Sequence, residues 1–249
     1  MEGAGTVEAV GPGVTDLKPG NRVAYASAPL GAYAEARLMP AERVVRVPDS
    51  ISDQQAAAMM LQGMTVEYLV RRTYPIKRGD TVLIHAAAGG IGLIFCQWAK
   101  HLGATVIGTV GSDDKAKLAK AHGCDHAIIY TREDFAKRVK EITGGSGVPV
   151  VYDSIGKDTF EGSLDCLRPR GLMVSFGNAS GPVPPFSPAI LGAKGSLFLT
   201  RPSLAHYNAA RADLVESAKA LFEVVTSGAV KIAVNQTYPL KDAAQAHRD

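Results

Sequence analysis

A glycine-rich turn near the middle of the chain constrains its fold more than any other feature. The segment reads His85-Ala86-Ala87-Ala88-Gly89-Gly90-Ile91-Gly92. It follows the apolar run 81–84, which is typical of a buried strand, and it precedes the amphipathic stretch 91–102, which is typical of a helix. Such a turn lets a diphosphate rest on bare backbone N–H groups at the N-terminus of the helix. The segment therefore predicts a dinucleotide-binding unit.

The match to the pattern G-x-G-x-x-G is imperfect, because Ala87 stands where the pattern has its first glycine. A side chain on Gly89 would hold the phosphates away, and Gly92 lets the helix lie close to the strand. A purely structural turn between a strand and a helix is the alternative interpretation. We favour nucleotide binding because a second strand, 104–110, follows at the expected distance and the alternation of strands and helices continues.

That alternation predicts an α/β fold, a Rossmann doubly wound parallel sheet of six strands in the order 3-2-1-4-5-6. The expected strands are 81–86, 104–110, 126–130, 150–154, 172–176 and 196–200. The expected helices are 90–102, 113–122, 132–143 and 158–167.

The segments on either side of this alternation have a different pattern. Short strand-like runs separated by Gly and Pro indicate a small β-rich unit at the N-terminus. These runs are 6–11, 21–25, 32–36 and 44–48. Further along the chain we expect helices at 53–61 (capped by Ser52), 65–74 and 211–226, a strand at 230–238 and the start of a helix after 240.

Composition limits the location and the partners of the chain. Its 249 residues contain no run of 18 apolar residues, and the first residues have neither the charge nor the apolar stretch of a signal peptide. The net charge of +3 is too small to argue for nucleic acid. Three scattered cysteines indicate a reducing compartment without a disulfide framework. We therefore expect a cytoplasmic protein with no membrane segment and no nucleic-acid partner.

The end of the second expected strand favours NADP(H) over NAD(H). An acid at this position holds the free ribose 2′-hydroxyl of NAD, but here the strand ends in Gly111 and Ser112, which leave room for a 2′-phosphate. Lys115 and Tyr130 lie at the ends of neighbouring elements and could hold that phosphate, and Arg132 is a further candidate.

Two acidic residues leave NAD(H) as an alternative cofactor. Asp113 or Asp114 could serve as the ribose acid, displaced by a few residues. Both more simply favour the start of the next helix, near the positive end of its dipole.

The residues of a zinc site are absent from the sequence. A zinc dehydrogenase needs clustered thiolate or imidazole ligands. The six histidines are spread along the chain without the spacing H-x-H or H-x-x-x-H, and no cysteine precedes Cys96. We therefore expect no metal and a hydride transfer that depends on the cofactor alone.

Taken as an ordered set, several stretches resemble the NADPH:quinone oxidoreductase (zeta-crystallin-like) branch of the medium-chain dehydrogenase/reductase superfamily. The resemblance covers nearly all of the chain. The stretches that carry it are 2–5, 20–25, 62–66, 85–92, 151–156, 175–178 and 200–204.

The resemblance implies a partial GroES-like catalytic domain at 1–62, a Rossmann NADP-binding domain at 63–227 and a return to the catalytic domain at 228–249, with the active site between the two domains. It implies three groups of cofactor-binding residues. The diphosphate group is Ala88, Gly89, Gly90, Ile91 and Gly92, the adenosine-phosphate group is Gly111, Ser112, Lys115 and Tyr130, and the ribose and nicotinamide group is Thr65, Ser154, Phe176, Gly177, Leu199 and Arg201.

The resemblance also implies an activity, which is the reduction of a small quinone or similar conjugated carbonyl by NADPH without zinc. Relatives begin before Met1 and extend past Asp249, so the substrate wall is expected to be incomplete in this chain. No catalytic residue stands out, although Tyr25, Tyr33 and Tyr68 are available as proton donors. An enoyl or alkenal reductase shares every motif, and a crystallin-like structural or RNA-binding role is the alternative from another class. A homodimer through the edge strand 196–200 is expected.

Overall fold

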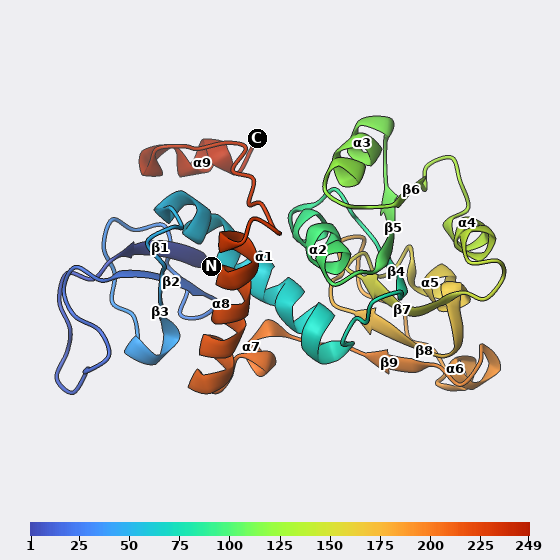
Figure 1. The fold of residues 1–249 in the computed structure, drawn as a ribbon, viewed down its shortest axis with the longest axis horizontal. Coiled ribbons are helices and arrows are strands. Elements are labelled where there is room, and N and C mark those ends of the chain that lie inside the picture. The colour runs from blue at the N-terminus through green and yellow to red at the C-terminus, as the bar shows by residue number, and fades with distance from the viewer. The chain divides into compact units, whose positions relative to one another are not determined.

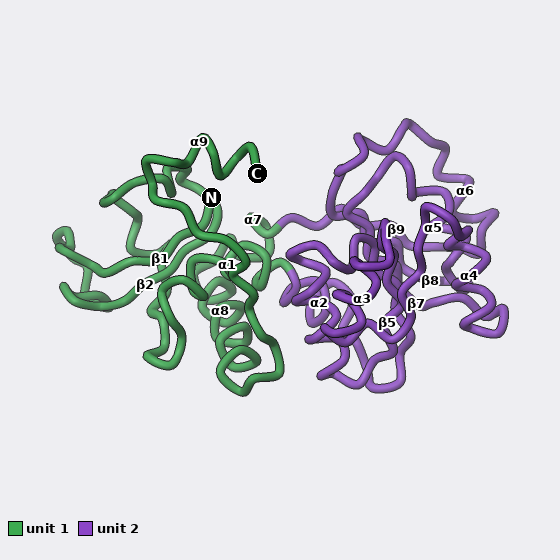
Figure 2. The backbone as a smooth tube through the Cα atoms, turned by 90° about the horizontal axis from the view of Figure 1, so that it is seen from above, with its two compact units in different colours: residues 1–65, 204–249 green, residues 66–203 purple.

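The computed structural model describes all residues, 1–249, and divides them into two compact units. The first contains residues 1–65 and 204–249, and the second contains residues 66–203 (Figure 2). The domain limits inferred from the sequence, at 62/63 and 227/228, stay a prediction.

The second unit contains a six-stranded parallel sheet. Its strands lie in the order β6-β5-β4-β7-β8-β9, which confirms the predicted order 3-2-1-4-5-6. In chain order the strands are β4 (Thr81–Ile84), β5 (Thr105–Val110), β6 (His126–Ile129), β7 (Val148–Asp153), β8 (Leu167–Ser175) and β9 (Phe198–Thr200). The central strands are almost wholly buried and apolar, as a sheet covered on both faces requires.

Helices cover both faces of this sheet (Figure 1). Neighbours α2 and α3 pack against β5, while α4 and α5 pack together on the other side of the sheet. Their bounds are α2 (Gly90–His101), α3 (Asp113–Ala121), α4 (Phe135–Ile142) and α5 (Phe160–Cys166), and the short α6 (Ala189–Ala193) lies in the connection to β9. The sequence predicted the first four within a few residues at each end, because their apolar positions recur with the helical period.

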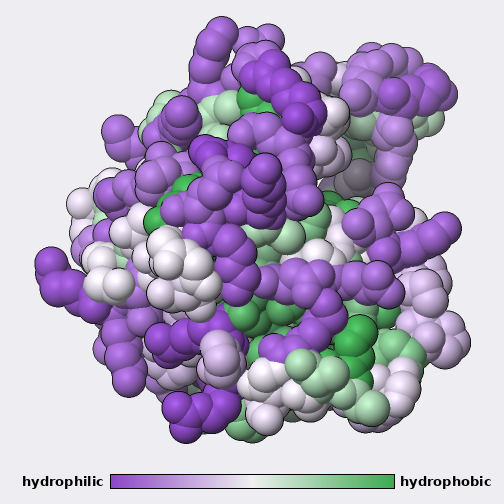
Figure 3. Space-filling model, turned by 90° about the vertical axis from the view of Figure 1, so that its right-hand side faces the viewer, coloured by the Kyte–Doolittle hydropathy of each residue, from purple (hydrophilic) through white to green (hydrophobic).

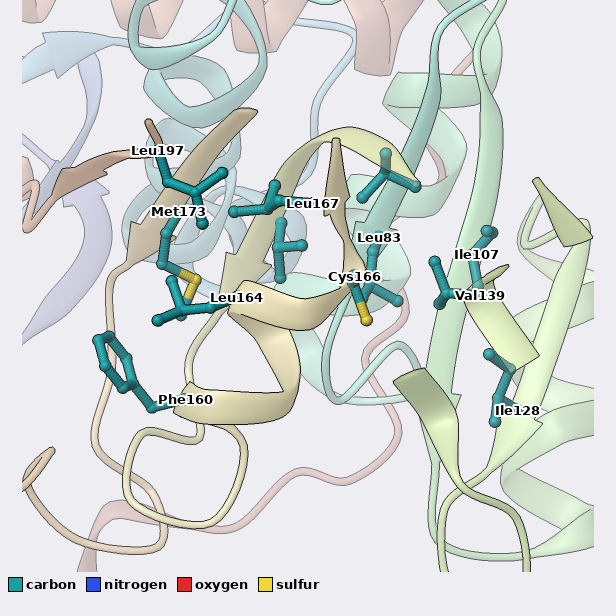
Figure 4. Packing of buried hydrophobic residues seen from close by; sticks show 12 residues of the cluster. Leu83, Ile107, Ile128, Val139, Phe160, Leu164, Cys166, Leu167, Met173 and Leu197 are labelled. Atoms are coloured by element: carbon teal, nitrogen blue, oxygen red, sulfur yellow. The ribbon is translucent and has the colours of Figure 1, made fainter. Parts of the chain in front are cut away.

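Buried apolar side chains fill the space between the sheet and the helices α4 and α5. Figure 4 shows Leu83 and Cys166 between two groups of this cluster, one from β5, β6 and α4 and one from α5, β8 and the segment before β9. The cluster consists of Leu83, Ile107, Ile128, Val139, Val148, Val151, Phe160, Leu164, Cys166, Leu167, Met173 and Leu197. This packing fixes the carboxyl ends of the strands, where ligands bind in doubly wound folds.

The first unit contains a small antiparallel sheet in the order β1-β2-β3 and several helices. The strands are β1 (Glu2–Thr6), β2 (Arg22–Ala26) and β3 (Val45–Arg46), with a single turn, η1 (Ala41–Arg43), before the last. The helices are α1 (Asp53–Tyr68), whose last three residues belong to the second unit, α7 (Leu204–Tyr207), α8 (Arg211–Thr226), η3 (Leu240–Asp242) and α9 (Ala243–Ala246). The helix predicted at 211–226 is confirmed to the residue.

Three predicted strands are wrong. The first strand lies at Glu2–Thr6 instead of 6–11, because this stretch pairs with β2 and the chain then turns. Residues 32–36 form bends, in which Ala34 N donates to Ala32 O at 3.0 Å. Residues 230–238 have no strand partner. A strand requires a hydrogen-bonded neighbour, and the alternation of apolar residues does not indicate whether such a neighbour exists.

The two helices predicted at 53–61 and 65–74 are one continuous helix, α1, followed by a π-helical turn, η2 (Leu69–Thr73). Ser52 caps it as predicted: Ser52 Oγ accepts from Gln55 N at 3.2 Å and Ser52 N donates to Gln55 Oε1 at 3.1 Å. Gly63 lies inside this helix. A Cβ at this position would stand 2.6 Å from a methyl group of Leu221 on α8, so a glycine leaves room for the Leu221 side chain. The small size of Gly63 reflects packing and not a break in the helix.

One face of the surface is shown in Figure 3. Hydrophilic side chains cover most of the face in Figure 3, and apolar side chains reach the surface in its lower half. None of the helices combines the length and the apolarity that crossing a lipid bilayer would demand.

Candidate functional site

The turn after β4 is held by the two neighbouring strands. His85 N donates to Tyr152 O, and Ala87 N donates to Thr109 O, each at 3.0 Å. Between them Ala86 has a φ of +55°, a left-handed conformation that is uncommon for a residue with a side chain. Its carbonyl accepts from Gly89 N at 2.9 Å, which closes the turn. The backbone is thus directed into the helix within a few residues.

The first turn of α2 presents free backbone donors. The first helical hydrogen bond runs from Leu93 N to Gly89 O at 2.9 Å, and no side chain caps the helix. The N–H groups of Gly90, Ile91 and Gly92 therefore have no acceptor within the helix. Together with the positive end of the helix dipole they fit a diphosphate.

Two glycines allow this turn to pack closely. A Cβ on Gly92 would stand 2.6 Å from the carbonyl carbon of Ala87, so α2 lies against the turn as predicted. A Cβ on Gly108 of β5 would stand 2.5 Å from the Cβ of Ala87. Gly108 thus provides the space for the alanine that replaces the first glycine of the pattern. Gly108 is not among the predicted site residues, although a glycine inside an apolar strand signals a close approach of this kind.

A cavity of about 520 Å³ lies beside the turn, within the second unit. It opens at the carboxyl ends of β4, β5 and β7, where a doubly wound fold binds its ligand. Its lining consists of His85, Ala86, Ala88, Gly89, Thr109, Val110, Gly111, Lys115, Tyr130, Phe135, Ile155, Asp158, Thr159, Ala179 and Ser180. The volume is within the range of small-molecule and cofactor sites.

Five of the predicted cofactor residues line this cavity, namely Ala88, Gly89, Gly111, Lys115 and Tyr130. The structure therefore brings the predicted diphosphate and adenosine-phosphate groups to one place. Most of the remaining lining comes from the loops after β7 and β8 and from α4, which the glycine motif does not indicate. The sequence signals for those walls were the predicted helices after 132 and 158 and the stretches 151–156 and 175–178 that carry the resemblance.

The start of α3 shows which of the charged candidate residues have ion-pair partners. Ser112 caps the helix, since its Oγ accepts from Lys115 N at 3.3 Å. Asp113 forms an ion pair with Arg132 at 2.5 Å, and this hydrogen-bonded guanidinium lowers the pKa of the Asp113 carboxyl. Lys115 lines the cavity without an acidic partner. Of the two candidate cations, Lys115 lines the cavity and Arg132 does not.

The second acid in this turn is also engaged. Asp114 pairs with Lys117 at 3.2 Å, on the exposed side of α3. Neither Asp113 nor Asp114 is among the residues that line the cavity.

A second group of predicted residues gathers beyond the ends of β7, β8 and β9. Arg201 Nη1 donates to the carbonyl of Gly177 at 3.1 Å and to that of Ser175 at 2.9 Å. A Cβ on Gly177 would stand 2.8 Å from the Cα of Ser154, so these loops touch. Phe176 N donates to the carbonyl of Asp153 at 2.8 Å. These residues adjoin the segments 155–159 and 179–180, which line the cavity.

The remaining two predicted residues are in neither group. Leu199 lies in β9 and pairs with Met173 of β8. Thr65 belongs to α1 in the first unit, where its hydroxyl donates to Leu61 O at 2.7 Å. Their predicted contacts with a cofactor stay predictions.

Metal-ligating side chains are not grouped in this structure. No three side chains of His, Cys, Asp or Glu lie together in a way that could hold a metal ion.

The sequence matches two described families. Residues 90–227 match the family described as zinc-binding dehydrogenase, and residues 1–49 match the alcohol dehydrogenase GroES-like domain. The two matches agree with the parallel sheet and the small antiparallel sheet described above.

Individual relatives are similar over the whole chain. A quinone oxidoreductase of Pseudomonas aeruginosa is 54% identical over 248 residues, which are 100% of this chain and 76% of the relative. A 2-haloacrylate reductase of Burkholderia sp is 53% identical and covers 100% of this chain and 75% of its own length. The crystal structure of Escherichia coli quinone oxidoreductase complexed with NADPH superposes with a TM-score of 0.96 at 53% identity, covering 99% of this chain and 76% of that one.

Proposed function

Since the chain belongs to the quinone oxidoreductases of the medium-chain dehydrogenase/reductase superfamily, we propose that it reduces a small quinone with NADPH. The observation that carries the proposal is the turn after β4, whose free N–H groups adjoin a cavity with an unpaired lysine. Residues at the turn fit the diphosphate of a dinucleotide, and the structure of the Escherichia coli relative contains NADPH.

The cofactor is NADP(H). Ala88, Gly89 and the amides of Gly90, Ile91 and Gly92 hold the diphosphate, and the 2′-phosphate lies near Lys115. The other adenosine-phosphate residues are Gly111, Ser112 and Tyr130, and the ribose and nicotinamide residues are Thr65, Ser154, Phe176, Gly177, Leu199 and Arg201. An ammonium group without a carboxylate partner favours the additional phosphate of NADP.

The chemistry needs binding and orientation from this chain. When bound, NADPH would supply the hydride, and the resulting hydroquinone anion would take up one proton to become the hydroquinone. The residues at the turn fix the cofactor, which lowers the entropy lost on reaching the reactive geometry. We assign no proton donor and no metal, since the sequence carries no cysteine before Cys96 and no paired histidines.

A second acceptor class is supported by one observation. The Burkholderia relative, 53% identical, is named a 2-haloacrylate reductase. Its acceptor is a conjugated carbonyl, and a hydride transfer to such an acceptor would use the same cofactor site.

Turnover of the purified chain with a panel of acceptors tests the proposal. We expect oxidation of NADPH, followed at its absorbance band, with 1,4-benzoquinone as the better acceptor than a 2-alkenal or a 2-haloacrylate. NADH serves as the control and should be used poorly. Faster turnover of the alkenal or haloacrylate would favour the second acceptor class, and equal use of NADH would contradict the assignment of Lys115.

We also propose a homodimer in the cytoplasm. Strand β9 is an edge of the parallel sheet, and its Phe198 side chain is 61% exposed. An unpaired edge can pair with its copy across a two-fold axis. Sedimentation should give twice the mass of the chain, and Phe198→Lys should shift it to the monomer. A monomeric parent chain would contradict the proposal.

A further inference from the structure

A row of buried polar groups lies behind the cavity of the second unit. His85 Nδ1 is 2.9 Å from Thr109 Oγ1, and His85 Nε2 is 2.9 Å from Ser163 Oγ. Ser163 Oγ in turn lies 2.9 Å from Asp153 Oδ2. All four side chains are buried, and those of Asp153 and Ser163 are fully excluded from solvent. His85 and Thr109 also line the cavity.

The carboxylate at the end of this row fixes the direction of every hydrogen bond. An ionised carboxylate only accepts, so Ser163 gives its single proton to Asp153. The Ser163 oxygen must then accept from His85, which places the imidazole proton on Nε2. Thr109 donates to the unprotonated Nδ1. Burial lowers the pKa of His85, against the opposing effect of Asp153, and so keeps the ring neutral.

Asp153 also holds one wall of the cavity. Its Oδ1 accepts from Ile155 N at 2.8 Å and from Gly156 N at 3.0 Å, and its Oδ2 accepts from Thr159 Oγ1 at 2.7 Å. Ile155 and Thr159 line the cavity and follow β7, which flanks β4 on the side away from β5. The row therefore connects two walls, one from β5 and one from the loop after β7.

The order of the groups excludes a hydrolase-like role. In a serine nucleophile the histidine stands between the acid and the hydroxyl and removes the proton of the hydroxyl. Here Ser163 stands between the acid and His85, is fully buried and has no access to a substrate.

We propose that His85, Ser163 and Asp153 are positioning residues for the dinucleotide, because they set Thr109 and the 155–159 loop at a fixed distance across the cavity. The inference rests on the proposed nucleotide site. Since these groups act on the binding walls and not on the reacting atoms, their loss raises the KM for NADPH and leaves kcat at saturation nearly unchanged.

The direction of the row gives a spectroscopic test that needs no cofactor. In Asp153→Asn, the amide oxygen keeps the two backbone donors and its NH₂ group faces Ser163. The Ser163 proton must then turn to His85 Nε2, while Thr159 can donate to Gly156 O, which lies 3.4 Å away. We expect the His85 tautomer to change from Nε2–H to Nδ1–H, which the ¹⁵N and ¹³C chemical shifts of the ring report. The chain has six histidines, and the signal that disappears in His85→Gln is the one that belongs to His85.

A second variant tests the effect on binding. Ser163→Ala removes the bridge, and we expect the Kd for NADPH to rise about tenfold, the scale of one buried hydrogen bond, with kcat within twofold. The matched control is Ser217→Ala in the first unit, a buried serine whose Oγ has no hydrogen-bond partner. It should leave the Kd and kcat unchanged.

The outcomes separate this inference from the proposed function. If the unmodified chain binds no NADPH, the proposed function fails, but the tautomer measurement still tests the hydrogen-bond directions in the row. If it binds NADPH but Ser163→Ala binds equally well, or if His85 carries its proton on Nδ1 in the unmodified chain, the inference is overturned.

Discussion

Replacing Gly89 by alanine should remove most of the affinity for NADPH while leaving the fold intact. Gly89 lines the cavity at the N-terminus of α2, and its φ of −80° is open to alanine. The new methyl group would lie 3.3 Å from Ala86 O, which needs only a small adjustment. It would, however, stand where the diphosphate approaches the backbone. We expect the Kd to rise about a hundredfold, roughly 2.7 kcal/mol.

Calorimetric titration with NADPH and thermal unfolding measure the two effects separately. The comparison is Gly92→Ala, whose Cβ would meet backbone atoms of the turn at 2.6–2.7 Å. Overpacking of this kind costs about 1–3 kcal/mol, so Gly92→Ala should lose both stability and binding. Gly192→Ala on α6, with open space around the new Cβ, is the neutral control. If Gly89→Ala binds NADPH as tightly as the parent, the diphosphate does not lie at this turn.

Replacing Lys115 by alanine should remove the preference for NADPH over NADH. Lys115 lines the cavity and has no acidic partner, whereas Arg132 is held by Asp113. A charged hydrogen bond to the 2′-phosphate contributes about 1.5–3 kcal/mol, and solvent exposure reduces this value. We therefore expect kcat/KM for NADPH to fall about tenfold, with the value for NADH unchanged.

The same helix supplies the control for this experiment. Lys117→Ala removes an equal charge two residues away, but Lys117 is exposed and paired with Asp114. Kinetics with both cofactors should show no change in the ratio for this variant. An equal loss in both variants would mean that only the general positive charge of α3 matters.

The parallel sheet could be predicted because its signals are local. Each strand is a short apolar run and each helix repeats its apolar positions. The order of strands is that of the doubly wound fold, which such an alternation predicts. The small sheet of the first unit was predicted less well. Residues 32–36 and 230–238 have strand-like composition, yet neither has a partner strand. Pairing depends on the rest of the fold, which a local pattern does not contain.

Of the site, too, the part that is continuous in sequence could be predicted and the part formed by distant residues could not. The glycine turn is continuous in sequence, and the free Lys115 lies only a few residues past the end of β5. The row behind the cavity joins residues that are 24 and 78 positions apart in sequence. Thr109, Ser163 and Asp153 carry no spacing that would reveal their contact. Likewise, Gly108 signals a close approach to its strand, but only the pairing of β4 and β5 shows that Ala87 fills the space.

A ¹⁵N-resolved NMR titration of the intact chain tests the central claim, that the amides at the start of α2 bind the diphosphate. On addition of NADPH, the resonances of Gly90, Ile91 and Gly92 should shift the most, together with that of Gly89. Inorganic pyrophosphate should move the same signals more weakly. If NADPH binds the folded chain and leaves these amides unchanged, the account of the site is wrong.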